Sequence, residues 1–187
     1  ASDVYKRQGI PLAIMRNHIS KVGGFLNLYV GTDLEYVKYG FVEDYQGLPD
    51  NTRFAFIQGE ESKSVPASGK VTYRGHAILN NALHQGRQES GAWIGTVIST
   101  SNPVHVDVDF GAKKLSGEVR SVNAGTIPLL ADIKGSKFEG THRDGWETKG
   151  AFYGPNAAEL AGTFRNLKDK AAPTLGVFGA KQQQNNE

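Results

Sequence analysis

The alternation of side chains in residues 104–110 is the feature that most constrains how this chain folds. Its apolar and polar positions alternate without exception, Val104, Val106, Val108 and Phe110 against His105, Asp107 and Asp109. Successive side chains of a β-strand point to opposite faces of a sheet, so this pattern predicts a strand with one apolar and one wet face. A similar alternation follows in residues 115–120, beyond the turn Gly111-Ala112-Lys113. The two runs together predict a β-hairpin.

Strand-length runs occur along most of the chain. They cover residues 25–31, 34–42, 53–57, 71–79, 93–98, 127–133, 137–142, 147–154, 160–166 and 174–180. Turn-forming residues separate nearly all of them at about ten-residue spacing, which is typical of a sandwich or an up-and-down barrel. The one helix-like piece, residues 156–160 after Pro155, is long enough for a single turn.

Glycines inside these runs favour a barrel over a sandwich. The chain contains 23 glycines, and several interrupt predicted strands: Gly75, Gly95, Gly117, Gly140, Gly150 and Gly162. A sheet that bends tightly needs glycine where side chains would crowd its concave side. We therefore predict an all-β chain, with a small closed antiparallel β-barrel of about eight strands. A smaller β-rich part precedes it, and the polar stretch 59–69 marks the boundary.

Charge and cysteine content exclude several classes of function. Lys and Arg number 21 against 19 Asp and Glu, which does not favour electrostatic capture of nucleic acid. The absence of cysteine excludes disulfides, thiolate metal sites and a cysteine nucleophile. No run of about 18 apolar residues is present, so no transmembrane helix is expected. Motifs of hydrolases, nucleotide-binding loops and zinc proteases are missing, and we predict that the chain is not an enzyme.

The first eight residues stand apart from the rest. Asp3-Val4-Tyr5-Lys6-Arg7-Gln8 resembles the translation of an adapter used to prepare sequencing libraries. We expect residues 1–8 to be non-native, and the natural N-terminus with any export signal to lie outside this fragment. The predicted division is residues 9–65 for a partial N-terminal domain, 66–181 for the barrel and 182–187 for a polar tail.

Three separated motifs resemble the β-barrel domain of the transferrin-binding protein B family of Gram-negative surface lipoproteins. Residues 150–164, GAFYGPNAAELAGTF, with 176–181, GVFGAK, are similar to its closing signature. Residues 106–117 are similar to its middle hairpin and residues 69–75 to its first barrel strand. Residues 25–65 resemble the second half of the "handle" domain that precedes such barrels. One handle with one barrel is typical of the single-lobe, hemophilin-like branch.

The resemblance implies a non-catalytic ligand-binding protein for haem or iron acquisition, lipid-anchored on the outer membrane or secreted. Its implied partners are haem or a haem- or iron-carrying host protein, with an outer-membrane receptor or export machinery as further partners. The alternative is a host-protein-binding lipoprotein or adhesin of the complement factor H-binding or heparin-binding type, without an iron role. A third hypothesis is an enzyme or a lipocalin-like carrier with a ligand inside the barrel.

Candidate ligand residues are histidines and tyrosines. His18, His76, His84, His105 and His142 are scattered without zinc-site spacing, so no metal centre is predicted. Haem needs only one axial ligand and an apolar pocket. Because hemophilin-like proteins hold haem with the handle and adjoining loops, the resemblance favours His18 and His84. Tyr36 and Tyr39 join them, since tyrosine can stack on a porphyrin or ligate ferric iron. The alternatives are exposed loop histidines and tyrosines that pack the handle core.

Overall fold

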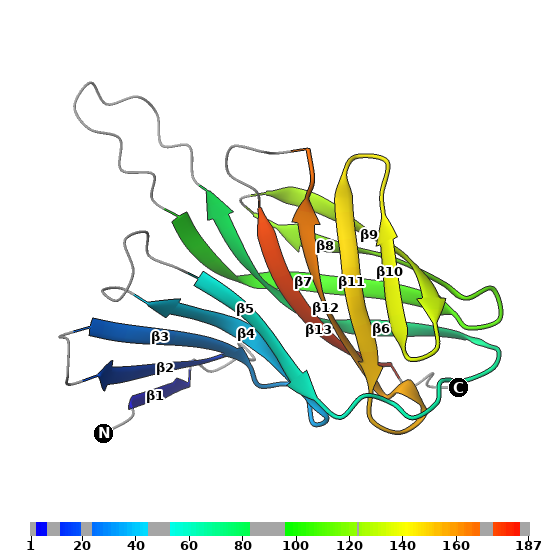
Figure 1. Cartoon of the computed structure of the whole chain (residues 1–187), viewed down its shortest axis with the longest axis horizontal. Helices are drawn as coiled ribbons and strands as arrows, with labels where there is room; N and C mark the ends of the chain where they lie inside the picture. Colours follow the sequence, from blue (N-terminus) through cyan, green and yellow to red (C-terminus); the bar gives the residue numbers. More distant parts are fainter. Residues whose placement is uncertain are drawn as a thin grey trace.

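The computed structural model describes residues 3–6, 12–19, 24–44, 53–82, 96–122, 124–168 and 174–183. These residues form two antiparallel β-sheets that lie side by side (Figure 1). None of the described elements is a helix of the length and hydropathy that a bilayer crossing requires.

The N-terminal sheet, called the handle sheet here, has five strands in sequential order. They are β1 (Asp3–Lys6), β2 (Leu12–Ile19), β3 (Gly24–Gly31), β4 (Val37–Asp44) and β5 (Arg53–Gly59). The last three were predicted from their β-branched and aromatic content. Neither β1 nor β2 was predicted: β1 falls in the segment expected to be non-native, and β2 combines an apolar run with a polar end.

The C-terminal sheet is the predicted closed barrel of eight strands. They are β6 (Lys70–Ala82), β7 (Thr96–Asp109), β8 (Lys114–Ser121), β9 (Gly125–Lys134), β10 (Lys137–Thr141), β11 (Trp146–Tyr153), β12 (Glu159–Asn166) and β13 (Leu175–Gln182). Each strand pairs with its neighbours in sequence, and β13 pairs with β6 to close the ring. Part of the strand predicted at 93–98 lies outside the described residues, and Thr96 begins β7.

Apolar side chains fill the inside of the barrel. Val104, Val106 and Val108 are buried there, as their alternation predicts. Phe152 lies at the centre of an aromatic cluster, with ring centroids 5.4 Å from Phe110 and 5.5 Å from Phe138. Burial of this interior is the main source of the barrel's stability.

Paired glycines make room for the phenylalanine rings of this interior. Gly150 in β11 lies opposite Gly162 in β12. A Cβ at Gly150 would lie 2.4 Å from Cζ of Phe138, and one at Gly162 would lie 2.9 Å from Cε1 of Phe178. The sheet thus curves around the phenylalanine side chains at positions where its own residues are glycines. This is the tight curvature that the glycines in these strands predicted.

The expected helical turn is a short 3₁₀ turn, Pro155–Ala157, between β11 and β12. Asn156 does not cap it, because its own backbone is left-handed with φ 53°, and Gly154 precedes the turn with φ 73°. The buried hydroxyl of Tyr73 donates to the carbonyl of Ala157 at 2.6 Å, which ties the turn to β6.

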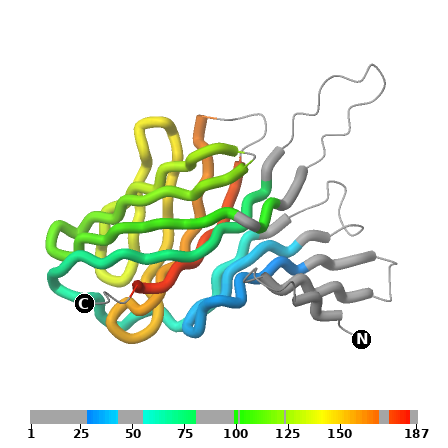
Figure 2. Tube along the Cα trace, turned by 180° about the vertical axis from the view of Figure 1, so that it is seen from behind, coloured from blue at the N-terminus to red at the C-terminus, as the bar shows by residue number. Residues whose placement is uncertain are grey.

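Strands β4 and β5 of the handle sheet lie against the outer wall of the barrel beside β12 and β13 (Figure 2). Val37, Tyr39 and Phe41 of β4 pack against Ile78 of β6 and Val177 of β13 in a second hydrophobic core. Ile78 is 2% exposed although it points out of the barrel, because the handle sheet lies over it. The two sheets are therefore joined by an apolar junction.

Candidate binding site

Because the interior of the barrel is filled, the candidate binding surfaces lie on its outside. The side chains of Tyr73, Phe138, Phe152, Phe164 and Phe178 occupy the space where a lipocalin-like carrier would hold its ligand, and none is more than 2% exposed. A small barrel packed in this way offers binding surfaces only on its wall and its loops. The junction with the handle sheet is the part of that outer surface with the most distinctive polar geometry.

A single carboxylate holds the β3–β4 loop to the barrel. Glu159, the first residue of β12, accepts hydrogen bonds from the backbone amides of Glu35 at 2.7 Å, Tyr36 at 2.8 Å and Val37 at 3.2 Å. Its side chain is buried, and these bonds satisfy a charge that would otherwise be costly to bury. Glu159 therefore fixes the position of Tyr36 relative to the barrel.

Tyr36 stands between two hollows beside this contact. The larger, of about 580 Å³, lies between the β3–β4 loop and the ends of β6 and β13. The smaller, of about 380 Å³, lies between Tyr36, residues 60–64 and the turn at Pro155. The ring of Tyr36 rests on Gly154, where a Cβ would be 2.5 Å from its Cδ2. Contacts of both its backbone and its ring thus hold Tyr36 in position.

Tyr39 takes a different place, inside the junction. Its hydroxyl donates to Oδ1 of Asp33 at 3.3 Å, and Oδ2 of Asp33 lies 3.5 Å from Nδ1 of His76 on β6. Burial, together with the Asp33 carboxylate, raises the pKa of the Tyr39 phenol above its ordinary value. Asp33 thereby lies between a handle tyrosine, which donates a hydrogen bond to it, and a barrel histidine.

Comparison with known families identifies the barrel. The family described as "C-lobe and N-lobe beta barrels of Tf-binding protein B" matches residues 65–182, more than half of the 187 residues. The chain belongs to the β-barrel family of transferrin-binding protein B. The family predicted from the three sequence motifs is confirmed, while the hemophilin-like branch stays a prediction.

Relatives of this family include two kinds of neisserial protein. Transferrin-binding protein B of Neisseria meningitidis serogroup A is 29% identical over 169 residues, which is 68% of this chain and 23% of that protein. Neisserial heparin binding antigen of N. meningitidis serogroup B is 29% identical over 155 residues, 80% of this chain and 29% of that protein. The chain thus spans less than a third of the length of either relative.

Solved structures of transferrin-binding protein B share the arrangement of handle sheet and barrel. The intact protein with N and C lobes, named Ap-TbpB, superposes with a TM-score of 0.69 at 26% sequence identity. The superposition covers 95% of this chain and 39% of that one. Both sheets of this chain therefore belong to the shared fold.

Of the four ligand residues predicted from the resemblance, the structure describes the side chains of Tyr36 and Tyr39, and these two lie in different places. Tyr36 lines both hollows, whereas Tyr39 is 1% exposed in the junction, in agreement with the packing alternative. The backbone of His18 lies in β2 opposite Phe25, rather than in a loop, and its side chain is outside the described part. His84 lies outside the described residues altogether.

The other histidines lie beside aspartates on the barrel. Nε2 of His105 is 3.3 Å from Asp107, and Nδ1 of His142 is 3.3 Å from Asp144. Within the described ranges, no three side chains of His, Asp or Glu gather as a metal site would require. These histidines take part in local polar contacts on the wall and at a hairpin end.

Glu159 and Asp33, the polar residues of the junction, are not among the residues predicted from the sequence. In the sequence, Glu159 stands within the closing signature, in the run Ala157-Ala158-Glu159-Leu160-Ala161. A lone carboxylate among small apolar residues is the one signal that could have drawn attention to it, because a buried charge needs partners. The sequence contains no comparable signal for Asp33.

Proposed function

We propose that this chain is the binding part of a non-catalytic surface or secreted protein that captures haem or a haem- or iron-carrying host protein. The observation that carries the proposal is the filled barrel beneath a firmly docked handle sheet. A rigid scaffold of this kind presents its outer surfaces and loops in a fixed geometry, so less entropy is lost when a ligand binds. Transferrin-binding protein B relatives support the iron-related ligand class.

Haem itself would be held by residues other than those lining the two hollows. The lining described for these hollows is rich in charged and polar side chains, such as Glu35, Glu60 and Lys181. A porphyrin needs apolar walls and an axial ligand. In this proposal His18 and His84, from the handle and the β6–β7 connection, supply the axial ligand.

Titration of hemin into the protein expressed from its complete gene tests this proposal. A sharpened and shifted Soret band that is lost in His18→Ala or His84→Ala supports haem capture. His105→Ala, on the outer wall of β7, is the matched control and should leave the spectrum unchanged. An unaltered spectrum of free hemin, at every protein concentration, refutes haem as the ligand.

Capture from host serum tests the protein-ligand form of the proposal. Immobilised protein should retain an iron- or haem-carrying protein, identified by mass spectrometry, from serum. Failure to enrich such a protein, combined with an unchanged hemin spectrum, refutes the iron role.

The second candidate is a glycosaminoglycan-binding surface protein. The similarity to neisserial heparin binding antigen extends over 80% of this chain, which favours it over the remaining alternatives. Retention on a heparin column that is lost with rising salt would support this candidate, because such binding depends on ionic contacts.

A further inference from the structure

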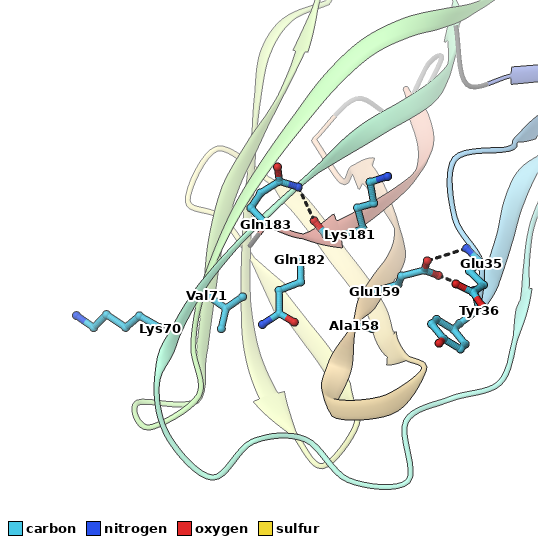
Figure 3. Close-up of a pocket in the computed structure, with 9 residues that line it drawn as sticks. All are labelled: Glu35, Tyr36, Lys70, Val71, Ala158, Glu159, Lys181, Gln182 and Gln183. Atoms are coloured by element: carbon cyan, nitrogen blue, oxygen red, sulfur yellow. Dashed lines mark hydrogen bonds between the residues drawn. The ribbon is translucent and has the colours of Figure 1, made fainter. Parts of the chain in front are cut away.

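The larger hollow beside Tyr36 is a groove with both hydrogen-bond donors and acceptors along its sides (Figure 3). Figure 3 shows Tyr36 on the side formed by the β3–β4 loop, and Val71 and Gln182 on the side formed by β6 and β13. Its volume of about 580 Å³ is in the size range of small-molecule sites.

The charges of the groove nearly cancel. Lys70 points away from it in Figure 3, and its ammonium lies 3.6 Å from Asp109. The Glu159 carboxylate is engaged by backbone amides, as described above. Glu35 and Lys181 then contribute one negative and one positive charge to the lining. A strongly charged ligand would therefore meet a like charge as well as an opposite one.

The remaining polar groups suit a ligand that both donates and accepts hydrogen bonds. Gln182 brings an amide to the lining, and it is exposed to solvent. Gln183 brings another, whose Nε2 donates to the Lys181 carbonyl at 3.0 Å. Amide, carboxylate and ammonium groups together can pair with hydroxyls, each of which is donor and acceptor at once.

Tyr36 adds an aromatic surface that is positioned before any ligand arrives. Glu159 holds its backbone and Gly154 supports its ring. A rigid aromatic side chain offers a large apolar area at low entropic cost. One fixed ring beside mixed polar groups suits the face of a sugar, which is apolar at its C–H groups and polar at its rim.

We propose that this groove binds an uncharged oligosaccharide of two or three sugar units. The proposal goes beyond capture of haem or iron carriers and does not depend on it. Its prediction is that Tyr36, Lys181 and Gln182 contact the sugar, while residues at the other end of the barrel do not.

Amide chemical shifts of the ¹⁵N-labelled chain, measured during titration with chitotriose and with maltotriose, test the proposal. At least one of these neutral probes should shift the amides of Tyr36, Gln182 and Gln183 in a saturable way. Gln182→Ala and Lys181→Ala should each weaken the apparent affinity about tenfold or more. Both side chains are exposed, so the fold should be retained. The matched controls Gln58→Ala and Lys134→Ala change exposed residues outside the groove and should leave the affinity unchanged.

A heparin tetrasaccharide serves as the anionic arm of the same experiment. Saturable shifts at the groove with this probe, but not with the neutral sugars, would overturn the proposal that the ligand is uncharged. Absence of shifts with both neutral probes at 20 mM ligand, roughly twenty times a millimolar Kd, would overturn the site. Equal effects of the groove and control variants would overturn it as well.

Discussion

The ring of Tyr39 lies against Gly179, so that a handle residue packs directly on the backbone of the barrel. A Cβ at Gly179 would lie 2.4 Å from Cε1 of Tyr39 and 2.7 Å from Cδ1 of Leu34. On the handle side, a Cβ at Gly31 would lie 2.2 Å from Cζ of the same ring. Glycines on both sides thus form the space that the tyrosine occupies, and the junction depends on their lack of side chains.

Gly179→Ala should loosen the handle sheet. The added methyl overlaps the Tyr39 ring, which must move out of a closely packed site, and overpacking of this kind costs about 1–3 kcal/mol. The free energy of unfolding, measured with denaturant, should fall by that amount. Gly111→Ala is the matched control, because its Cβ would have no neighbour closer than 3.4 Å. Equal effects of the two substitutions would contradict the importance of this contact.

Glu159→Gln should release the β3–β4 loop. The amide side chain lacks the charge and one of the acceptor oxygens that now serve three backbone amides. We expect a loss of about 1–3 kcal/mol in the free energy of unfolding. Hydrogen exchange at the amides of Glu35, Tyr36 and Val37 should accelerate. Thr163→Ala, on the same strand and the same outward face, should leave that exchange unchanged; acceleration in both variants would point to general loosening.

Alkaline pH should destabilise the fold through buried tyrosines. Burial raises the pKa of Tyr73 above its ordinary value, and the pKa of Tyr39 is raised by burial and Asp33. Above about pH 10 the unfolded state therefore binds fewer protons than the folded state, and stability falls as pH rises. Denaturant unfolding from pH 8 to 11 should show this decline.

Tyr73→Phe tests the origin of that decline. Removal of one such group should reduce the slope above pH 10 by about 1.4 kcal/mol per pH unit. At pH 8 the variant should be less stable by about 1 kcal/mol, because the hydrogen bond to Ala157 is lost. An alkaline slope equal to that of the unmodified chain would show that Tyr73 does not contribute.

Lys113→Gly should stabilise the hairpin between β7 and β8. Lys113 is exposed and has a left-handed backbone with φ 54°, which costs a side-chain-bearing residue about 1–2 kcal/mol. Glycine adopts this conformation freely but gains freedom in the unfolded chain, so the net gain should be about 0.5–1 kcal/mol. The melting temperature in thermal unfolding should rise accordingly. Ala112→Gly, in the same turn without a positive φ, should instead lower the melting temperature.

Local patterns were sufficient to predict the barrel. The alternation at Val104, Val106 and Val108 decides which side chains enter the core, since neighbouring residues of a strand must face opposite ways. The glycines at 150 and 162 indicated a tightly curved sheet, because glycine relieves crowding on its concave side. In both cases the information lies within a few residues along the chain.

The junction could not be predicted in the same way. Glu159 bonds to amides more than 120 residues away, and nothing near it in the sequence identifies them. Tyr36 and Tyr39 look equivalent in a tyrosine-rich segment. The two tyrosines differ in burial because Tyr39 shares the inward face of β4 with Val37 and Phe41, while Tyr36 precedes the strand.

The amino-acid sequence alone determined most of the strands and the closed barrel, because both depend on residue types at short, regular spacing. Three of its motifs were sufficient to indicate the family by resemblance. Tertiary structure alone decided which tyrosine is buried, which carboxylate holds the loop and where a groove opens. Those outcomes depend on how one face of the handle sheet meets the outer wall of the barrel. Contacts between distant segments leave little trace in local periodicity.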